Sequence, residues 1–254
     1  MLIRTAGRIC WFLFEVVVII TCYFFTAARA PKEKQRHARA AWLSWSSRRH
    51  LKIFGYTADV AGEIPRHGLL ICNHLSYLDI LAISSVTPAV FVSKADVRRW
   101  PLFGWFAAIA GTVFVDRQRR QQVGEVNQEI EAALAAGELV VIFPEGTSTN
   151  GESILPFRTS LLEPAARGQY EISVGWLHYE LADGDARQEV CYWGDHTFFS
   201  HVVHLLGLRK IRATVRFGKF QHTTDDRKVL AGQLREAVLK LKTAATEVTR
   251  SPAP

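Results

Sequence analysis

The chain has 254 residues, of which 48% are hydrophobic and 22% are charged, and its formal net charge is +7. This length predicts one substantial domain with an appendage, and the composition is not that of a polytopic membrane protein. The four cysteines (Cys10, Cys22, Cys72 and Cys191) form no C-x-x-C pair, which argues against a disulfide framework and a metal site.

The excess positive charge lies at one end of the chain. Of the 31 basic and 24 acidic residues, nine and two fall within residues 1–50, so the remaining 204 residues are balanced. A basic segment beside an apolar one is typical of contact with anionic lipid headgroups. A nucleic-acid-binding protein would spread such charge over its folded domain, so we expect membrane lipids and no nucleic acid as partners.

The first predicted element is an apolar helix from Ile9 to Ala28, interrupted by Glu15. Its length, about 30 Å as a helix, fits the thickness of a bilayer core. Three interpretations stay open: a cleaved signal peptide, a spanning helix, and a monotopic anchor in which Glu15 lies near an interface. The next stretch, Arg36 to Leu51, mixes basic residues with tryptophan and suits the headgroup boundary. Residues 1–50 are therefore predicted to form a membrane anchor and a basic interfacial segment.

From about residue 52, short β-branched runs alternate with helical stretches, which predicts an α/β fold. The expected strands are Leu69–Cys72, Ala89–Ser93, Thr112–Val115, Leu139–Phe143, Ile172–Leu177, Glu189–Trp193 and Ile211–Phe217. Apolar residues recur at helical spacing from Val123 to Leu134, before Gly137, and again from Val229 to Leu241. We place the main domain at residues 51–243 and expect a disordered tail at 244–254.

The first candidate site is Asn73-His74-Leu75-Ser76-Tyr77-Leu78-Asp79, which follows an apolar strand. If His74 lies in the turn and Asp79 in the first turn of the following helix, the carboxylate can reach one imidazole nitrogen. Asp79 would then orient His74, and the imidazole could accept a proton from a hydroxyl group. A hydrogen-bonded turn without chemistry is the alternative for this segment taken alone.

Two further segments follow apolar strands. Phe143-Pro144-Glu145-Gly146-Thr147-Ser148 predicts a tight loop that presents Glu145 at a strand end, where α/β folds place ligand sites. Gly111-Thr112-Val113-Phe114-Val115-Asp116-Arg117 delivers Arg117, a planar donor suited to phosphate or carboxylate, to the same kind of edge. An ordinary turn and a strand-end ion pair are the structural alternatives.

Together, Asn-His-x4-Asp, Gly-x-x-Phe-Val-Asp-Arg and Phe-Pro-Glu-Gly-Thr, in this order, resemble the glycerolipid acyltransferases typified by lysophosphatidic acid acyltransferase. The resemblance covers roughly Leu51 to Arg216. It implies a mainly parallel central sheet flanked by helices, with an N-terminal membrane-associated helical segment and the catalytic domain on the cytoplasmic face. It also implies direct transfer from acyl-CoA or acyl-carrier protein to a lysolipid hydroxyl, with no further cofactor and no metal.

The resemblance assigns roles to particular residues. His74 would be the general base and Asp79 its orienting partner, while Arg117 would contact the polar headgroup of the acceptor. The substrate-binding residues that we predict are Asn73, Arg117, Glu145, Gly146, Thr147 and Arg158.

One departure from the family pattern bears on the acceptor. Phosphatidate-forming members usually carry Arg directly after Phe-Pro-Glu-Gly-Thr, whereas this chain has Ser148. Arg158 is a candidate replacement for that cation. We therefore expect 1-acyl-sn-glycerol-3-phosphate as the acceptor, with a lyso-ornithine lipid as the rival. A hydrolase that activates water with the same pair, and a lipid-binding protein without catalysis, are the remaining alternatives.

Overall fold

The computed structural model describes residues 2–116 and 120–250. Within them, seven strands form one sheet in the order β1-β7-β6-β2-β5-β3-β4. Their bounds are β1 (Tyr56–Ala61), β2 (Gly68–Cys72), β3 (Val90–Lys94), β4 (Val113–Val115), β5 (Leu139–Ile142), β6 (Ile172–Leu181) and β7 (Ile211–Phe220). All neighbouring pairs are parallel except β6 and β7, which are antiparallel. The predicted mainly parallel α/β fold is confirmed.

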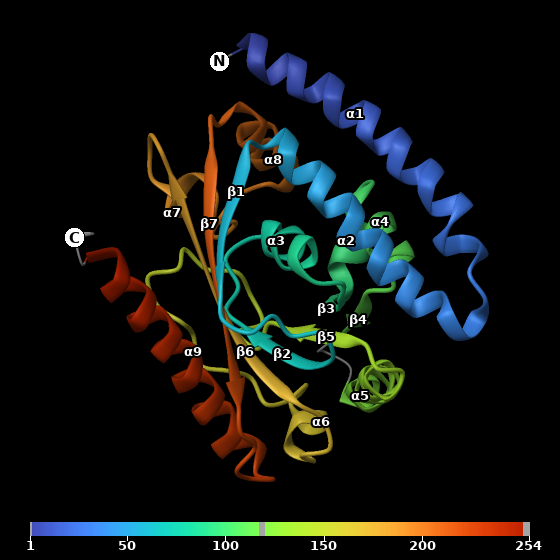
Figure 1. The fold of residues 1–254 in the computed structure, drawn as a ribbon, viewed down its shortest axis with the longest axis vertical. Coiled ribbons are helices and arrows are strands. Elements are labelled where there is room, and N and C mark those ends of the chain that lie inside the picture. The colour runs from blue at the N-terminus through green and yellow to red at the C-terminus, as the bar shows by residue number, and fades with distance from the viewer. Residues whose placement is uncertain (1, 117–119, 251–254) are drawn as a thin grey trace.

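Helices cover both faces of this sheet (Figure 1). Their bounds are α1 (Leu2–Phe25), α2 (Gln35–Ile53), α3 (Leu78–Val86), α4 (Phe103–Ile109), α5 (Arg120–Ala135), α6 (Glu163–Ala166), α7 (Ala186–Glu189), α8 (Phe198–Gly207) and α9 (Arg227–Arg250). On β2, Leu70 and Cys72 belong to the core that includes α3 and α8, whereas Leu69 and Ile71 belong to the core that includes α5 and α9. Because both faces are covered, β2 is apolar throughout and fully buried.

The described elements differ from the sequence-based expectations in three places. Glu189–Trp193 is not a strand, because Glu189 is the last residue of helix α7. At the other end of this short helix, Asp185 is the N-cap and accepts a hydrogen bond from the Arg187 amide at 2.9 Å. Strand β1 was not predicted, and it pairs in parallel with β7. The expected disordered tail is helical as far as Arg250, because Ala245 continues the apolar face of α9 and is buried against the core.

Helix α1 lies alongside α2 rather than apart from the domain (Figure 1). It is the one described helix long and apolar enough to cross a membrane by length and composition. Near its N-terminus, Arg4 and Arg8 donate to backbone carbonyls of Gly207 and Leu206 at the end of α8, both at 3.2 Å. Arginine at a helix C-terminus satisfies carbonyls that have no partner in the helix. The N-terminal end of α1 is therefore attached to the domain.

A partly buried ion pair, between Arg49 and the buried carboxylate of Glu15, joins the middle of α1 to α2. The Arg49 guanidinium donates to both carboxylate oxygens of Glu15, at 2.6 and 2.8 Å. Farther along, Trp42 packs against Tyr23 and donates from its indole to the Ile19 carbonyl at 2.9 Å. Helix α2 crosses the predicted boundary at residue 50 and ends at Ile53, so the division of the chain into segments stays a prediction.

Candidate active site

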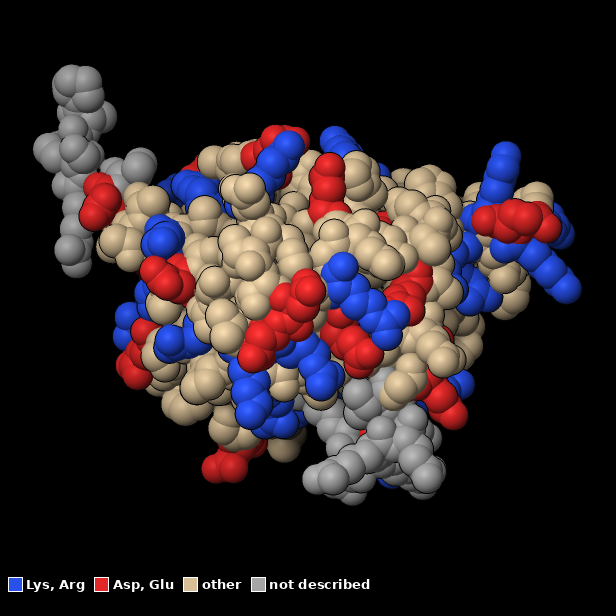
Figure 2. All heavy atoms as spheres, turned by 90° about the horizontal axis from the view of Figure 1, so that it is seen from below, with Lys and Arg blue, Asp and Glu red and all other residues tan. Residues whose placement is uncertain are grey.

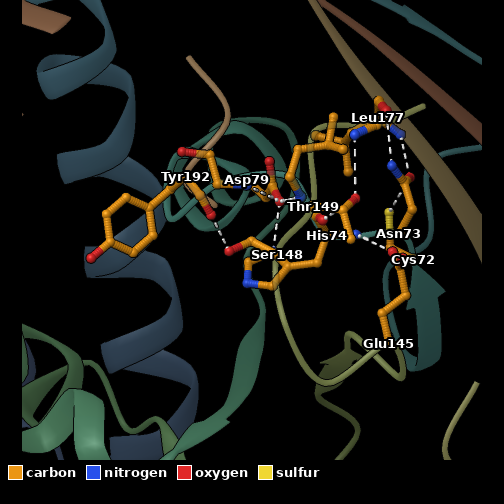
Figure 3. A network of polar contacts seen from close by, with 12 residues as sticks. Cys72, Asn73, His74, Asp79, Glu145, Ser148, Thr149, Leu177 and Tyr192 are labelled. Carbon is orange, nitrogen blue, oxygen red and sulfur yellow. Dashed lines mark hydrogen bonds and ion pairs between the residues drawn. The ribbon is translucent and has the colours of Figure 1, made fainter. Parts of the chain in front are cut away.

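The turn after β2 and the turn after β5 lie beside one another, because the two strands are parallel neighbours in the sheet. The first turn carries His74, and the second carries Glu145. The structure places Asp79 in the first turn of α3, the position from which it can reach the imidazole. Figure 3 shows the polar network that joins these two loops.

The central contact is between His74 and Asp79. The imidazole Nδ1 lies 2.7 Å from Asp79 Oδ2, and the same oxygen accepts the backbone N–H groups of Leu75 at 2.7 Å and Ser76 at 3.0 Å. The other oxygen, Oδ1, accepts the Tyr179 hydroxyl at 2.8 Å. Because a carboxylate oxygen can only accept hydrogen bonds, a neutral His74 imidazole in this contact carries its hydrogen on Nδ1, which leaves Nε2 as an acceptor.

The two side chains differ in their access to solvent. Asp79 is fully buried, whereas the His74 side chain is 21% exposed. The imidazole also stacks on Phe143, with ring centroids 4.2 Å apart and planes inclined by 15°. A fixed ring with one buried nitrogen and an accessible edge is the geometry that a general base requires.

Glu145 holds the loop backbone in place. One carboxylate oxygen accepts the His74 amide and the other accepts the Leu155 amide, both at 2.8 Å. Burial raises the pKa of this carboxyl above its ordinary value, while the two backbone hydrogen bonds oppose that shift. The turn closes through the Gly146 amide, which donates to the Phe143 carbonyl at 3.1 Å with Gly146 in the left-handed region (φ 76°). Glu145 therefore positions the backbone on both sides of the site.

Asn73 is buried and bonds strand β6. Its Oδ1 accepts the Leu177 amide at 2.8 Å, and its Nδ2 donates to the Leu177 carbonyl at 3.0 Å. Strand β2 leaves the sheet after Cys72, which is the last residue in its pairing with β6. The carboxamide thus continues the ladder in place of a peptide group, and the structure assigns Asn73 to the scaffold of the turn.

The remaining predicted residues are placed as follows. Arg158 is exposed, and its guanidinium makes no hydrogen bond or ion pair within the described ranges. Thr147 is exposed in the loop after Gly146. Arg117 lies outside the described residues. Ser148 donates its hydroxyl to the Tyr192 carbonyl, so its side chain is used within the protein.

Tyr179 and Phe143 are the site residues whose roles the sequence did not reveal. Tyr179 is 100 residues from Asp79 in the chain and reaches it from β6. The sequence offered one signal for this contact: a tyrosine in a buried strand needs a hydrogen-bond partner for its hydroxyl. Cys72, at the end of β2, is fully buried, and burial raises the pKa of its thiol well above its ordinary value.

An apolar cavity of about 130 Å³ begins beside this network. Its lining includes Tyr77 and Leu78, which both lie between His74 and Asp79 in the chain. The other walls come from α1, α2, α4 and α8, with aromatic side chains at Phe12, Trp42, Phe103, Phe106 and Phe198. Walls of this composition suit an aliphatic chain better than a polar group.

Comparisons with known proteins identify similar sequences and a similar fold. Residues 59–174 match the family model described as Acyltransferase. A lyso-ornithine lipid O-acyltransferase of Pseudomonas aeruginosa is 34% identical over 231 residues, 89% of this chain and 88% of that protein. A 1-acyl-sn-glycerol-3-phosphate acyltransferase of Neisseria gonorrhoeae is 35% identical over 121 residues, 47% of this chain and 48% of that protein. The crystal structure of the 1-acyl-sn-glycerophosphate acyltransferase of Thermotoga maritima superposes with a TM-score of 0.62 at 17% identity, covering 99% of this chain and all of that one.

Proposed function

Because this chain belongs to the acyltransferase family, we propose that it transfers a fatty acyl group from a thioester donor to the hydroxyl of a lyso-ornithine lipid. The sequence-based prediction of an O-acyltransferase acting on a lysolipid is confirmed by the family and the relatives, so its substrates are lipids. The observation that carries the proposed chemistry is the His74–Asp79 contact, which leaves Nε2 of an oriented, partly exposed imidazole as a proton acceptor.

In the proposed reaction, His74 Nε2 removes the proton from the acceptor hydroxyl as its oxygen attacks the thioester carbonyl. The negative charge of Asp79 stabilises the imidazolium that forms. Collapse of the tetrahedral intermediate breaks the carbon–sulfur bond, and the imidazolium returns the proton to the departing thiolate. No covalent acyl-enzyme is needed, since no activated nucleophile adjoins this pair within the described residues: burial raises the pKa of the Cys72 thiol.

Ser148 supports an amino-lipid acceptor over a phosphate one. At the position where phosphatidate-forming relatives usually carry Arg, the Ser148 hydroxyl is bonded to the Tyr192 carbonyl and supplies no positive charge. An ornithine headgroup carries one carboxylate and one ammonium group, so it needs less positive charge than a phosphate monoester. The similarity to a lyso-ornithine lipid O-acyltransferase also extends over most of both chains.

Lysophosphatidate is the second candidate acceptor, and a specific observation favours it. Arg158 follows the Phe-Pro-Glu-Gly-Thr loop and is exposed, and its amide donates to the Pro144 carbonyl at 2.9 Å. The backbone of Arg158 is therefore held beside that loop, from which a guanidinium can bind phosphate in two-pronged geometry. In either case, the acceptor would bind at the two loops that contain Asn73, Glu145, Gly146 and Thr147.

We assign the apolar cavity to an acyl chain. Its walls are almost wholly aliphatic and aromatic, and it adjoins the turn that carries His74. Acyl-CoA and acyl-carrier protein both present the thioester at the end of a long flexible arm, so either is a donor in this proposal.

We further propose that α1 lies in one leaflet, with the catalytic domain on the cytoplasmic face. One side of α1 is packed on the protein, and Glu15 is neutralised there by Arg49. The other side exposes Leu13, Phe14 and Val17 by more than half of their surface. The turn between α1 and α2 projects from the molecule and carries mainly basic side chains, which suits anionic headgroups (Figure 2).

The proposal is tested by offering lyso-ornithine lipid and lysophosphatidic acid side by side to the detergent-solubilised protein. We expect faster esterification of the amino-lipid by the wild type. Ser148→Arg should raise the relative rate with lysophosphatidic acid about ten-fold or more, because a charge-assisted hydrogen bond contributes about 1.5–3 kcal/mol. Ser148→Ala is the matched control and should leave the preference unchanged. A wild-type preference for lysophosphatidic acid would reject the amino-lipid proposal in favour of the second candidate.

A further inference from the structure

The Asp79 carboxylate has a fourth donor that lies outside the turn. Tyr179 projects from β6, and its hydroxyl donates to Oδ1 at 2.8 Å, while His74 and two backbone amides of the turn use Oδ2. Both Tyr179 and Asp79 are buried, with at most 2% of their surface exposed. This contact connects the central sheet directly to the proposed catalytic pair.

The hydroxyl constrains the carboxylate in two ways. With Oδ1 held from β6, the carboxylate cannot rotate about its χ2 bond without breaking the Tyr179 contact, so Oδ2 stays aligned with the imidazole. A donor on Oδ1 also stabilises negative charge on Asp79, which reduces the pull of that charge on a proton at His74. Position and basicity of the imidazole are thereby both coupled to Tyr179.

Tyr179 is suited to remain a donor throughout the reaction. Burial raises the pKa of its phenol well above the ordinary value, and the negative charge of Asp79 raises it further. The phenol therefore keeps its proton at neutral pH, and it does not compete with His74 as an acid or a base.

We propose that Tyr179 is a positioning residue for acyl transfer, acting through Asp79 to hold the His74 imidazole in its working orientation and to limit its basicity. The proposal rests on the proposed function, because it assigns Tyr179 to the same pair. Tyr179 does not contact the substrate in this account.

Other titratable groups face this pair, and they enter any change in its pH dependence. The charge of Asp79 acts on Tyr56 from β1, Cys72 from β2, Glu145 after β5, Tyr179 from β6 and Cys191 after α7. Among the described donors, only Tyr179 gives Asp79 a side-chain hydroxyl. Tyr56 offers a matched comparison, since its hydroxyl is buried and makes no hydrogen bond in the described part of the chain.

The test is Tyr179→Phe, with Tyr56→Phe as the control. Tyr179→Phe should lower kcat about ten-fold or more with little change in KM, because a hydrogen bond to a charged group is lost. It should also move the acidic limb of kcat/KM to higher pH by about 0.5 unit or more, since uncompensated charge on Asp79 favours the imidazolium. Tyr56→Phe should change neither quantity.

A second substitution keeps the shape of the side chain and should shift the acidic limb of kcat/KM in the opposite direction. Site-specific 3-fluorotyrosine at position 179 is a stronger donor, so the acidic limb should move to lower pH. In an Asp79→Asn background, Tyr179→Phe should have little further effect on kcat, because the coupling runs through the carboxylate.

The inference is overturned if Tyr179→Phe leaves the acidic limb in place, or if its loss of kcat only follows the loss of folded protein measured by circular dichroism. It also fails if Tyr56→Phe produces the same shift. Near-normal turnover by His74→Ala would instead reject the proposed catalytic pair itself, so the two failures are distinguishable.

Discussion

Asn73→Ala provides a direct test of how the first turn is built. The substitution removes the carboxamide that accepts the Leu177 amide at 2.8 Å and donates to the Leu177 carbonyl at 3.0 Å. Both backbone groups lie in a buried part of β6, beyond the last pairing with β2. A buried polar group without a partner costs about 1–3 kcal/mol, so two such groups predict a loss of about 2–6 kcal/mol.

Thermal unfolding followed by circular dichroism measures this loss. For a chain of this size, 1 kcal/mol corresponds to about 2–4 °C, so the Tm should fall by at least about 4 °C. Asn127→Ala is the matched control: Asn127 is also buried, but its amide nitrogen makes only long contacts at 3.3 and 3.5 Å and its oxygen has no partner among the described residues. The reasoning is refuted if Asn73→Ala destabilises the protein no more than Asn127→Ala does.

Three further predictions concern pH, the cavity and the membrane. Burial lowers the pKa of His201 to about 4, with help from neighbouring histidines. Its folded pKa is depressed below the unfolded value, so stability is fully present above about pH 6.5 and is lost as pH falls toward 4. Between pH 6.5 and 4.5, the free energy of unfolding of His201→Gln should therefore fall by about 2 kcal/mol less than that of the wild type. Chemical unfolding at the two pH values measures this difference, and an equal fall in both proteins would contradict the prediction. Leu81→Trp adds bulk to the cavity wall and should slow transfer from long acyl donors at least about ten-fold more than from short ones; a uniform effect would oppose the acyl-chain assignment. Phe14→Ser should weaken sedimentation with anionic vesicles several-fold, whereas Val229→Ser, on α9, should not; equal effects would argue against α1 as the membrane-facing helix.

Much of the sheet was predictable because its central strands are buried on both faces. Short apolar runs such as Leu69–Cys72 and Leu139–Phe143, with turn residues after them, favour buried strands over helices because of their length. Strand β1 (Tyr56–Ala61) was missed because most of its residues are exposed at the sheet edge and it pairs with a strand more than 150 residues away. The error at Glu189–Trp193 has a different cause, since its valine, cysteine and aromatic residues fill side-chain clusters around α8 without joining the sheet.

The candidate site was predictable where its contacts are local. The spacing of His74 and Asp79 predicted a contact if a turn at His74 is followed by a helix at Asp79, and the structure has this arrangement. Contacts between distant segments carry no such signal: Asn73 bonds Leu177 and Asp79 bonds Tyr179 across about 100 residues, and only the sheet order brings them together.

The proposed function requires that His74 activates the hydroxyl of a lipid acceptor. It is tested most directly by measuring thiol release from an acyl-thioester donor, with and without lyso-ornithine lipid, for the wild type and for His74→Ala shown to be folded by circular dichroism. We expect release by the wild type only when acceptor is present, matched by ester formation, and a fall of at least about 100-fold for His74→Ala. Near-normal release by His74→Ala, or equal release by the wild type without acceptor, would contradict the claim; the second result would indicate a hydrolase.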